Sequence, residues 1–268
     1  MVLHLRILSA MVGIPIILGL VYLGGAYYAF FILLVANLGM REYTALLKSR
    51  AYHLPDFIGY AGASIFLTML YLGSIQDVEL ILPAVIFIMM SLAVFLLLYF
   101  EKTDIHELAL ILWGIIYLGG FGGYMILLRQ LPQGLTYTFI LLVGVWANDT
   151  FAYFAGIKWG KKRLAPAISP KKSVEGACAA ITGTVLLALL VAFFYPGWIG
   201  LTPGKAALLG VGISVFAQLG DLLESALKRQ FEVKDSGRLI PGHGGILDRF
   251  DSLLFTAPMI YYFFALLG

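Results

Sequence analysis

The segment KRQFEVKDSGRLIPGHGGILDRFD, residues 228–251, holds nine charged side chains, although only 12% of the whole chain is charged. Its aspartates supply the carboxylate oxygens that Mg²⁺ prefers, usually one or two from the protein together with substrate phosphates. Its lysines and arginines suit phosphate, and its glycines can expose backbone N–H groups to phosphate as well. The segment therefore predicts metal-assisted chemistry on phosphorylated substrates.

Two carboxylates inside this segment and one shortly before it predict one metal site. On a helix, Asp221, Ser225 and Lys228 share a face at i, i+4 and i+7. Asp248 and Asp251 follow at i and i+3, where the last helix is expected to begin. We expect Asp221, Asp248 and Asp251 to bind the metal together. Simpler alternatives are an intrahelical ion pair or snorkelling for Lys228, and favourable charge at a helix N-terminus for Asp248.

A second group of candidate residues lies further upstream, in VWANDTFAYFAG and the loop IKWGKKRLAPAISPKKSVEG that follows. Asp149 falls about two turns inside an apolar stretch, where an ionisable residue usually indicates function. The six lysines and arginines of the loop are suited to polyphosphate binding. They are equally well explained as a topology signal, because cytoplasmic loops of membrane proteins carry an excess of basic residues. Both interpretations stay open. For His243 we favour a phosphate or loop hydrogen bond over a metal ligand.

The elements that position these residues are expected to be membrane helices. The 268 residues are 61% hydrophobic with a mean hydropathy of +0.93, which lies outside the range of soluble domains. Apolar stretches of about 20 residues can span a bilayer as helices. The predicted fold is an all-α, polytopic integral membrane bundle of about nine helices, at about residues 5–24, 26–45, 57–75, 79–100, 107–129, 135–156, 174–196, 204–227 and 246–267. GGFGG, residues 119–123, favours close helix packing over a helix break.

The basic residues predict the orientation of the bundle. With the N-terminus in the cytoplasm, 16 of the 18 lysines and arginines fall on the cytoplasmic side, and only Arg129 and Lys205 fall outside. We expect residues 1–104 to form an N-terminal helical platform. Residues 105–268 are expected to form the catalytic half, with two basic cytoplasmic loops. The single cysteine, Cys178, excludes an intramolecular disulfide.

SALKRQFEVKDSGRLIPGHGGILDRFD closely resembles the signature of the phosphatidate cytidylyltransferases. NDTFAYFAG and ISPKKSVEG upstream are also similar to stretches of that family. The resemblance covers about residues 145–255, whereas the N-terminal spans match only in character. The signature falls on Ser225, Lys228, Arg229, Lys234, Asp235, Pro241, His243, Gly244, Gly245, Asp248, Arg249 and Asp251.

The resemblance implies that CTP and phosphatidic acid react to CDP-diacylglycerol and pyrophosphate, with one or two Mg²⁺ ions as cofactor. It implies metal binding by Asp221, Asp248 and Asp251, with Asp149 and Asp235 as weaker candidates. The implied catalytic residues are Asp221, Lys228, Arg229, Lys234, Asp235, His243, Asp248, Arg249 and Asp251. The implied substrate-binding residues are Asp149, Ser169, Lys171, Lys172, Ser225, Gly244 and Gly245.

The expected partners are CTP, phosphatidic acid and membrane lipid, with a homodimer as an open alternative and no nucleic acid. The expected location is the inner (cytoplasmic) membrane, with the active site facing the cytoplasm. Two alternative functions are a related cytidylyltransferase acting on another lipid phosphate and an ion-coupled membrane transporter. A transporter would carry ionic residues deep in several spans, whereas the charge here gathers at helix ends.

Overall fold

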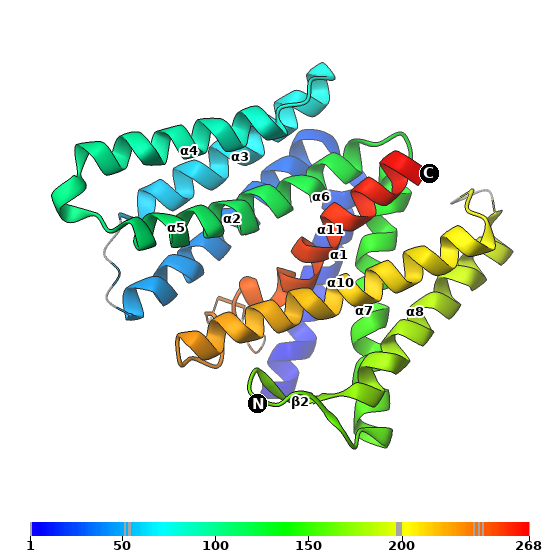
Figure 1. Ribbon diagram of the computed structural model, residues 1–268. Coiled ribbons are helices and arrows are strands. Elements are labelled where there is room, and N and C mark those ends of the chain that lie inside the picture. The colour runs from blue at the N-terminus through cyan, green and yellow to red at the C-terminus, as the bar shows by residue number, and fades with distance from the viewer. Residues whose placement is uncertain are drawn as a thin grey trace. The chain divides into compact units, whose positions relative to one another are not determined.

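The computed structural model of the chain describes residues 2–50, 52, 55–196, 200–237, 239–240, 242 and 244–267. Two short strands, β1 (Arg163–Ala165) and β2 (Ser169–Ser173), accompany the helices. The helices are α1 (Val2–Leu23), α2 (Gly25–Ser49), α3 (Asp56–Gln76), α4 (Ile81–Leu98), η1 (Phe100–Lys102), α5 (Ile105–Gly114), the π-helical η2 (Ile115–Gly120), α6 (Phe121–Gln130), α7 (Gly134–Trp159), α8 (Val174–Phe194), α10 (Pro203–Gln230) and α11 (Leu247–Leu267) (Figure 1).

The predicted all-α membrane architecture is confirmed. Eight helices among the described residues are long and apolar enough to cross a membrane, with α5, η2 and α6 counted as one helix. A shorter apolar helix, Ser9–Leu23, precedes them. Each of the nine predicted windows overlaps one of these helices. The side of the membrane on which the N-terminus lies stays a prediction.

The chain forms two compact units that interleave along the sequence. The first unit contains residues 1–130 and 233–249, and the second contains residues 131–232 and 250–268. The division by role at residue 104 stays a prediction, because compactness does not report which residues act on a substrate.

The first unit packs α2, α3 and the α5–η2–α6 helix closely together. A Cβ at Gly119 would lie 2.9 Å from the Ala63 Cα atom of α3, which requires glycine at the crossing. The predicted tight packing of GGFGG is therefore present. The π-helical turn η2 ends at Gly120, within the same segment. The stretch thus changes the helix geometry as well as its packing.

The second unit packs α7, α8, α10 and the main part of α11. A Cβ at Gly220 would lie 2.7 Å from the carbonyl oxygen of Asp251, so α10 and α11 meet backbone to backbone at that point. Strands β1 and β2 pair antiparallel, with Arg163 opposite Ser173. The loop predicted after the sixth span therefore contains a hairpin. Ser173 ends this hairpin and caps α8, because its hydroxyl accepts a hydrogen bond from the backbone N–H of Gly176.

Candidate active site

A cleft of about 880 Å³ that carries charged side chains opens within the second unit. It is formed by the second half of α7, the β1–β2 hairpin, the start of α8 and the middle of α10. The charged side chains that line it are Asp149, Arg163, Lys171, Lys172 and Asp221. A cavity of this size, with cations and carboxylates around it, is suited to a phosphorylated small molecule.

Asp221 of α10 is paired with the hairpin. The Lys172 Nζ atom lies 2.6 Å from Asp221 Oδ2, and the Ser225 hydroxyl donates to Asp221 Oδ1 at 3.3 Å. Asp221 and Ser225 therefore share one face of α10, as the spacing predicts, and the hydrogen bond between them adds to that prediction. The contact with Lys172 depends on the hairpin, which helical spacing could not reveal.

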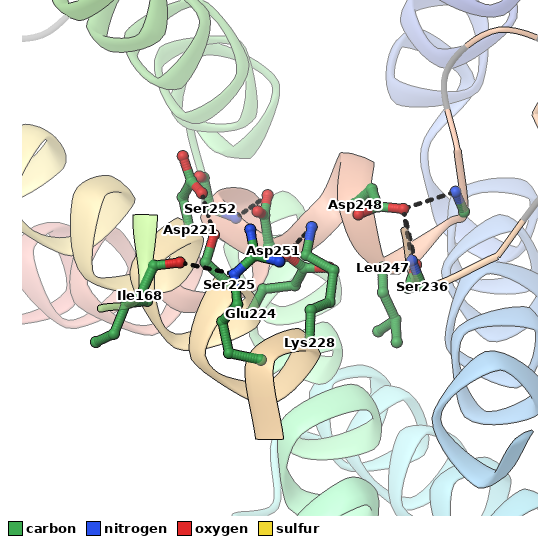
Figure 2. Close-up of polar contacts among 12 residues, drawn as sticks. Ile168, Asp221, Glu224, Ser225, Lys228, Ser236, Leu247, Asp248, Asp251 and Ser252 are labelled. Carbon is green, nitrogen blue, oxygen red and sulfur yellow. Dashed lines mark hydrogen bonds and ion pairs between the residues drawn. The ribbon is translucent and has the colours of Figure 1, made fainter. Parts of the chain in front are cut away.

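Lys228 lies beside Glu224 on α10. Its Nζ atom is 2.6 Å from Glu224 Oε2, and the two side chains are 14% and 3% exposed (Figure 2). The intrahelical ion pair considered as the simpler alternative is thus present. A phosphate-binding role for Lys228 stays a prediction.

Asp251 is a buried carboxylate in the first turns of α11. Its Oδ1 atom accepts a hydrogen bond of 2.7 Å from the backbone N–H of Ser252. The Asp251 carboxylate interacts electrostatically with Asp221, Asp149 and Lys228, and Figure 2 shows it beside Asp221. Two carboxylates and one ammonium of the second unit therefore lie near the Asp251 carboxylate.

A buried network of polar side chains supports Asp149, and sequence analysis missed it. The Ser214 hydroxyl donates to Asn148 Oδ1 at 2.7 Å, and Gln218 Nε2 donates to Ser214 Oγ at 2.9 Å. The Asn148 amide in turn donates to Asp149 Oδ1 at 3.1 Å. Asn148 and Gln218 both line the cleft. The available signal was Ser214 and Gln218 at i and i+4 within an otherwise apolar stretch of α10.

The loop before α11 belongs to the first unit and is bound by two carboxylates. Asp248 Oδ2 accepts hydrogen bonds from the Ser236 backbone N–H, the Ser236 hydroxyl and the Gly245 N–H, at 3.0, 3.0 and 2.8 Å (Figure 2). The second carboxylate is that of Glu42 in α2, which sequence analysis did not identify. The only signal was one carboxylate within the helical stretch MREYTALL.

The remaining predicted residues lie in both units. Lys234, Asp235 and Arg249 are exposed, and Gly244 has a φ of +83°. Arg229 Nε donates to the carbonyl oxygen of Ile168, next to Ser169. His243 lies outside the described residues.

The predicted three-aspartate site combines residues of both units, since Asp248 belongs to the first and Asp221 and Asp251 to the second. In the part of the chain that the structure describes, no three His, Cys, Asp or Glu side chains form a group that could hold a metal ion. The three-aspartate site stays a prediction.

Comparison with known proteins shows which family and which relatives this chain resembles. A family model described as "Cytidylyltransferase family" matches residues 4–267. A protein of Bacillus subtilis (strain 168) named phosphatidate cytidylyltransferase is 36% identical over 269 residues, covering 97% of each chain. Proteins of the same name from Synechocystis and Staphylococcus saprophyticus are 36% and 35% identical; the alignments cover 98% and 95% of this chain and 96% of each relative.

Proposed function

Since the chain belongs to the cytidylyltransferase family, we propose that it transfers the cytidylyl group of CTP to phosphatidic acid, forming CDP-diacylglycerol and pyrophosphate. The observation that carries this conclusion is the similarity, over nearly the full length of both chains, to proteins named phosphatidate cytidylyltransferase. The alternatives of another lipid phosphate and of an ion-coupled transporter receive no support from these relatives.

The two substrates explain the combination of apolar helices and a cleft that carries charged side chains. Phosphatidic acid stays in the bilayer with its acyl chains, whereas CTP is soluble and strongly anionic. An enzyme that joins them needs helices that reach the lipid and cations at a helix end. We therefore place the cleft at the inner face of the cytoplasmic membrane, in agreement with the distribution of basic residues.

The reaction requires two anions to approach each other. A phosphate oxygen of phosphatidic acid forms a bond to the α-phosphorus of CTP, and the bond from that phosphorus to the bridging oxygen of the β-phosphate breaks. The bonding electrons leave with pyrophosphate. The attacking phosphate is already ionised at neutral pH, so no general base is required. The protein therefore acts mainly by holding both phosphates in line and by offsetting their charge.

Cationic side chains around the cleft offset the negative charge of the phosphates. Lys171, Lys172 and Arg163 line it, and Ser169 lies in the same hairpin. We assign them to the phosphates of CTP. Because an ammonium is a point-charge partner for phosphate, Lys172 can exchange Asp221 for a CTP phosphate. That exchange would leave the Asp221 carboxylate available to a metal ion.

Carboxylate oxygens are ligands that suit Mg²⁺. Asp221 and Asp251 are carboxylates in one electrostatic environment, which also includes Asp149. We propose that Asp221 and Asp251 hold the metal, with Asp248 as a further ligand and Asp149 and Asp235 as weaker candidates. When bound, Mg²⁺ would neutralise phosphate charge near the bond that breaks.

The other residues of the signature are assigned to the substrates. Lys228, Arg229, Lys234 and Arg249 are proposed to bind phosphates of the two substrates. Ser225, His243, Gly244 and Gly245 are proposed to contribute hydrogen bonds near them.

The test is incubation of the purified chain with labelled CTP and phosphatidic acid in detergent micelles, with excess Mg²⁺ or with EDTA. We expect a labelled lipid and released pyrophosphate only with Mg²⁺. Parallel reactions with a polyprenyl phosphate serve as the lipid control. Label transfer to that lipid alone, or no transfer at all, would refute the proposed function; equal turnover in EDTA would refute the metal.

A further inference from the structure

The carboxylate of Glu42 holds the loop that precedes α11. Glu42 lies in α2 and is only 6% exposed. Its Oε1 atom accepts a hydrogen bond of 2.9 Å from the Ile246 N–H. Its Oε2 atom accepts bonds from the Leu247 N–H at 3.0 Å and from the Ser236 hydroxyl at 3.1 Å. One side chain from early in the sequence thus binds both ends of the segment 236–247.

The donors explain how a carboxylate can be buried there. Burial of a charge is costly unless hydrogen bonds replace water, and bonds to an ionised acceptor are about twice as strong as neutral ones. Two of the donors, the N–H groups of Ile246 and Leu247, lie at the N-terminus of α11, where the helix dipole favours negative charge. The loop that Glu42 organises therefore supplies the hydrogen bonds that replace water around its carboxylate.

Two glycines of the loop confirm how closely it fits this carboxylate. A Cβ at Gly237 would overlap Glu42 Oε1, and a Cβ at Gly245 would overlap both Glu42 Oε2 and the Ser236 hydroxyl. The Ser236 hydroxyl also donates to Asp248 Oδ2. Glu42 and Asp248 therefore share one donor, and the position of Asp248 depends on the loop that Glu42 holds.

We propose that Glu42 is a positioning residue for cytidylyl transfer, whose buried carboxylate holds Ser236 and the first turn of α11 in the arrangement that the reaction needs. The inference rests on the proposed function. The position of α11 matters because the helix, which begins at Leu247, carries Asp248, Arg249 and Asp251 in its first turns. A displaced helix start would displace these side chains, and small displacements of reacting groups are costly in rate.

The test is the nearly isosteric Glu42→Gln variant. A glutamine has only one oxygen acceptor, so either orientation of its amide turns an NH₂ group toward Ile246 N–H or Leu247 N–H. The matched control is Glu101→Gln, which changes an exposed carboxylate in η1 of the same unit. For each variant, kcat and the KM for CTP are measured on the monodisperse, folded fraction. Hydrogen exchange is followed in peptides that cover residues 233–250.

We expect Glu42→Gln to lower kcat by about tenfold or more, because reacting groups are misplaced. The KM for CTP should change by less than about threefold, since we assign the CTP phosphates to residues of the second unit. Exchange at Ile246 and Leu247 should accelerate by about tenfold, because a protecting acceptor is lost. The Glu101→Gln variant should match the wild type in all three measurements. A merely structural role would lower the folded fraction and leave kcat of the remainder unchanged.

Near wild-type kcat in folded Glu42→Gln would overturn the proposal, as would unchanged exchange at Ile246 and Leu247. If that variant does not fold, Ser236→Ala replaces it, since it removes the hydroxyl that Glu42 and Asp248 share and so releases one end of the loop from both carboxylates. Unchanged kcat in Ser236→Ala would then overturn the proposal. Wild-type protein that forms no CDP-diacylglycerol would instead refute the proposed function, while the exchange measurement would still report on the loop.

Discussion

Replacement of Lys228 by methionine would leave the Glu224 carboxylate without the ammonium that lies 2.6 Å away. The two side chains are 14% and 3% exposed, so water replaces little of the lost interaction. At this separation, an effective dielectric constant of about 20 gives a Coulomb attraction of about 6 kcal/mol, which the desolvation of both charges largely offsets. Removal of one partner from a buried pair usually costs about 3–5 kcal/mol, and we expect a loss of stability of that size.

The assay is unfolding in mixed micelles with increasing SDS, followed by tryptophan fluorescence. The companion variant is Glu224→Gln combined with Lys228→Met, which removes the uncompensated charge. We expect it to recover stability to within about 1 kcal/mol of the wild type, because exchange of a buried ion pair for neutral groups is often nearly neutral. Its turnover then separates the two interpretations of Lys228. Recovered turnover indicates an ion pair alone, whereas lost turnover in a stable protein indicates phosphate binding.

Two results would refute the reasoning on this pair. Lys228→Met with a stability within about 1 kcal/mol of the wild type would show that the pair is solvated or weak. A double variant as unstable as Lys228→Met would show that the methionine fits poorly, and that the lost charge partner is not the cause.

Three further predictions concern the second unit. We expect Asp221→Asn and Asp251→Asn each to lower CDP-diacylglycerol formation by about 100-fold or more at saturating Mg²⁺, because a proposed metal ligand is lost; near-normal turnover in folded protein would refute that assignment. Lys172→Ala should raise the KM for CTP by about tenfold, as measured in initial-rate assays, and an unchanged KM would remove Lys172 from the CTP site. Gly220→Ala should lower stability in SDS titration by about 1–3 kcal/mol, because its Cβ would lie 2.7 Å from the Asp251 carbonyl oxygen. Gly204→Ala, which has open space around its Cβ, is its control, and equal stability of the two variants would contradict the predicted clash.

The sequence alone predicted the helices and the family of the protein, because both depend on properties that are local along the chain. An apolar stretch long enough to cross a bilayer forms a helix whatever it packs against, since the backbone must satisfy its own hydrogen bonds there. All nine predicted windows accordingly overlap observed helices. The signature from Ser225 to Asp251 identified the chemistry for a similar reason, because phosphate and Mg²⁺ restrict which side chains can serve them.

Side-chain contacts were predicted least well from sequence spacing where a side chain had several partners within reach. Helical spacing placed Lys228 on the face of Asp221, but the Lys228 ammonium forms an ion pair with Glu224, one turn away. Asp221 is paired with Lys172, whose position depends on a hairpin that basic composition did not predict. The buried amide of Asn148 reaches Asp149 through a network completed by residues of α10.

Only the tertiary structure identified Glu42. The residue lies 194 positions before Ser236 and 205 before Leu247, and its neighbours in the sequence resemble any amphipathic helix. Its role arises because α2 and the loop before α11 pack together, so that backbone N–H groups converge on one carboxylate. Hydrophobicity and charge decide where helices form, whereas hydrogen-bond partners are decided by which of those helices meet.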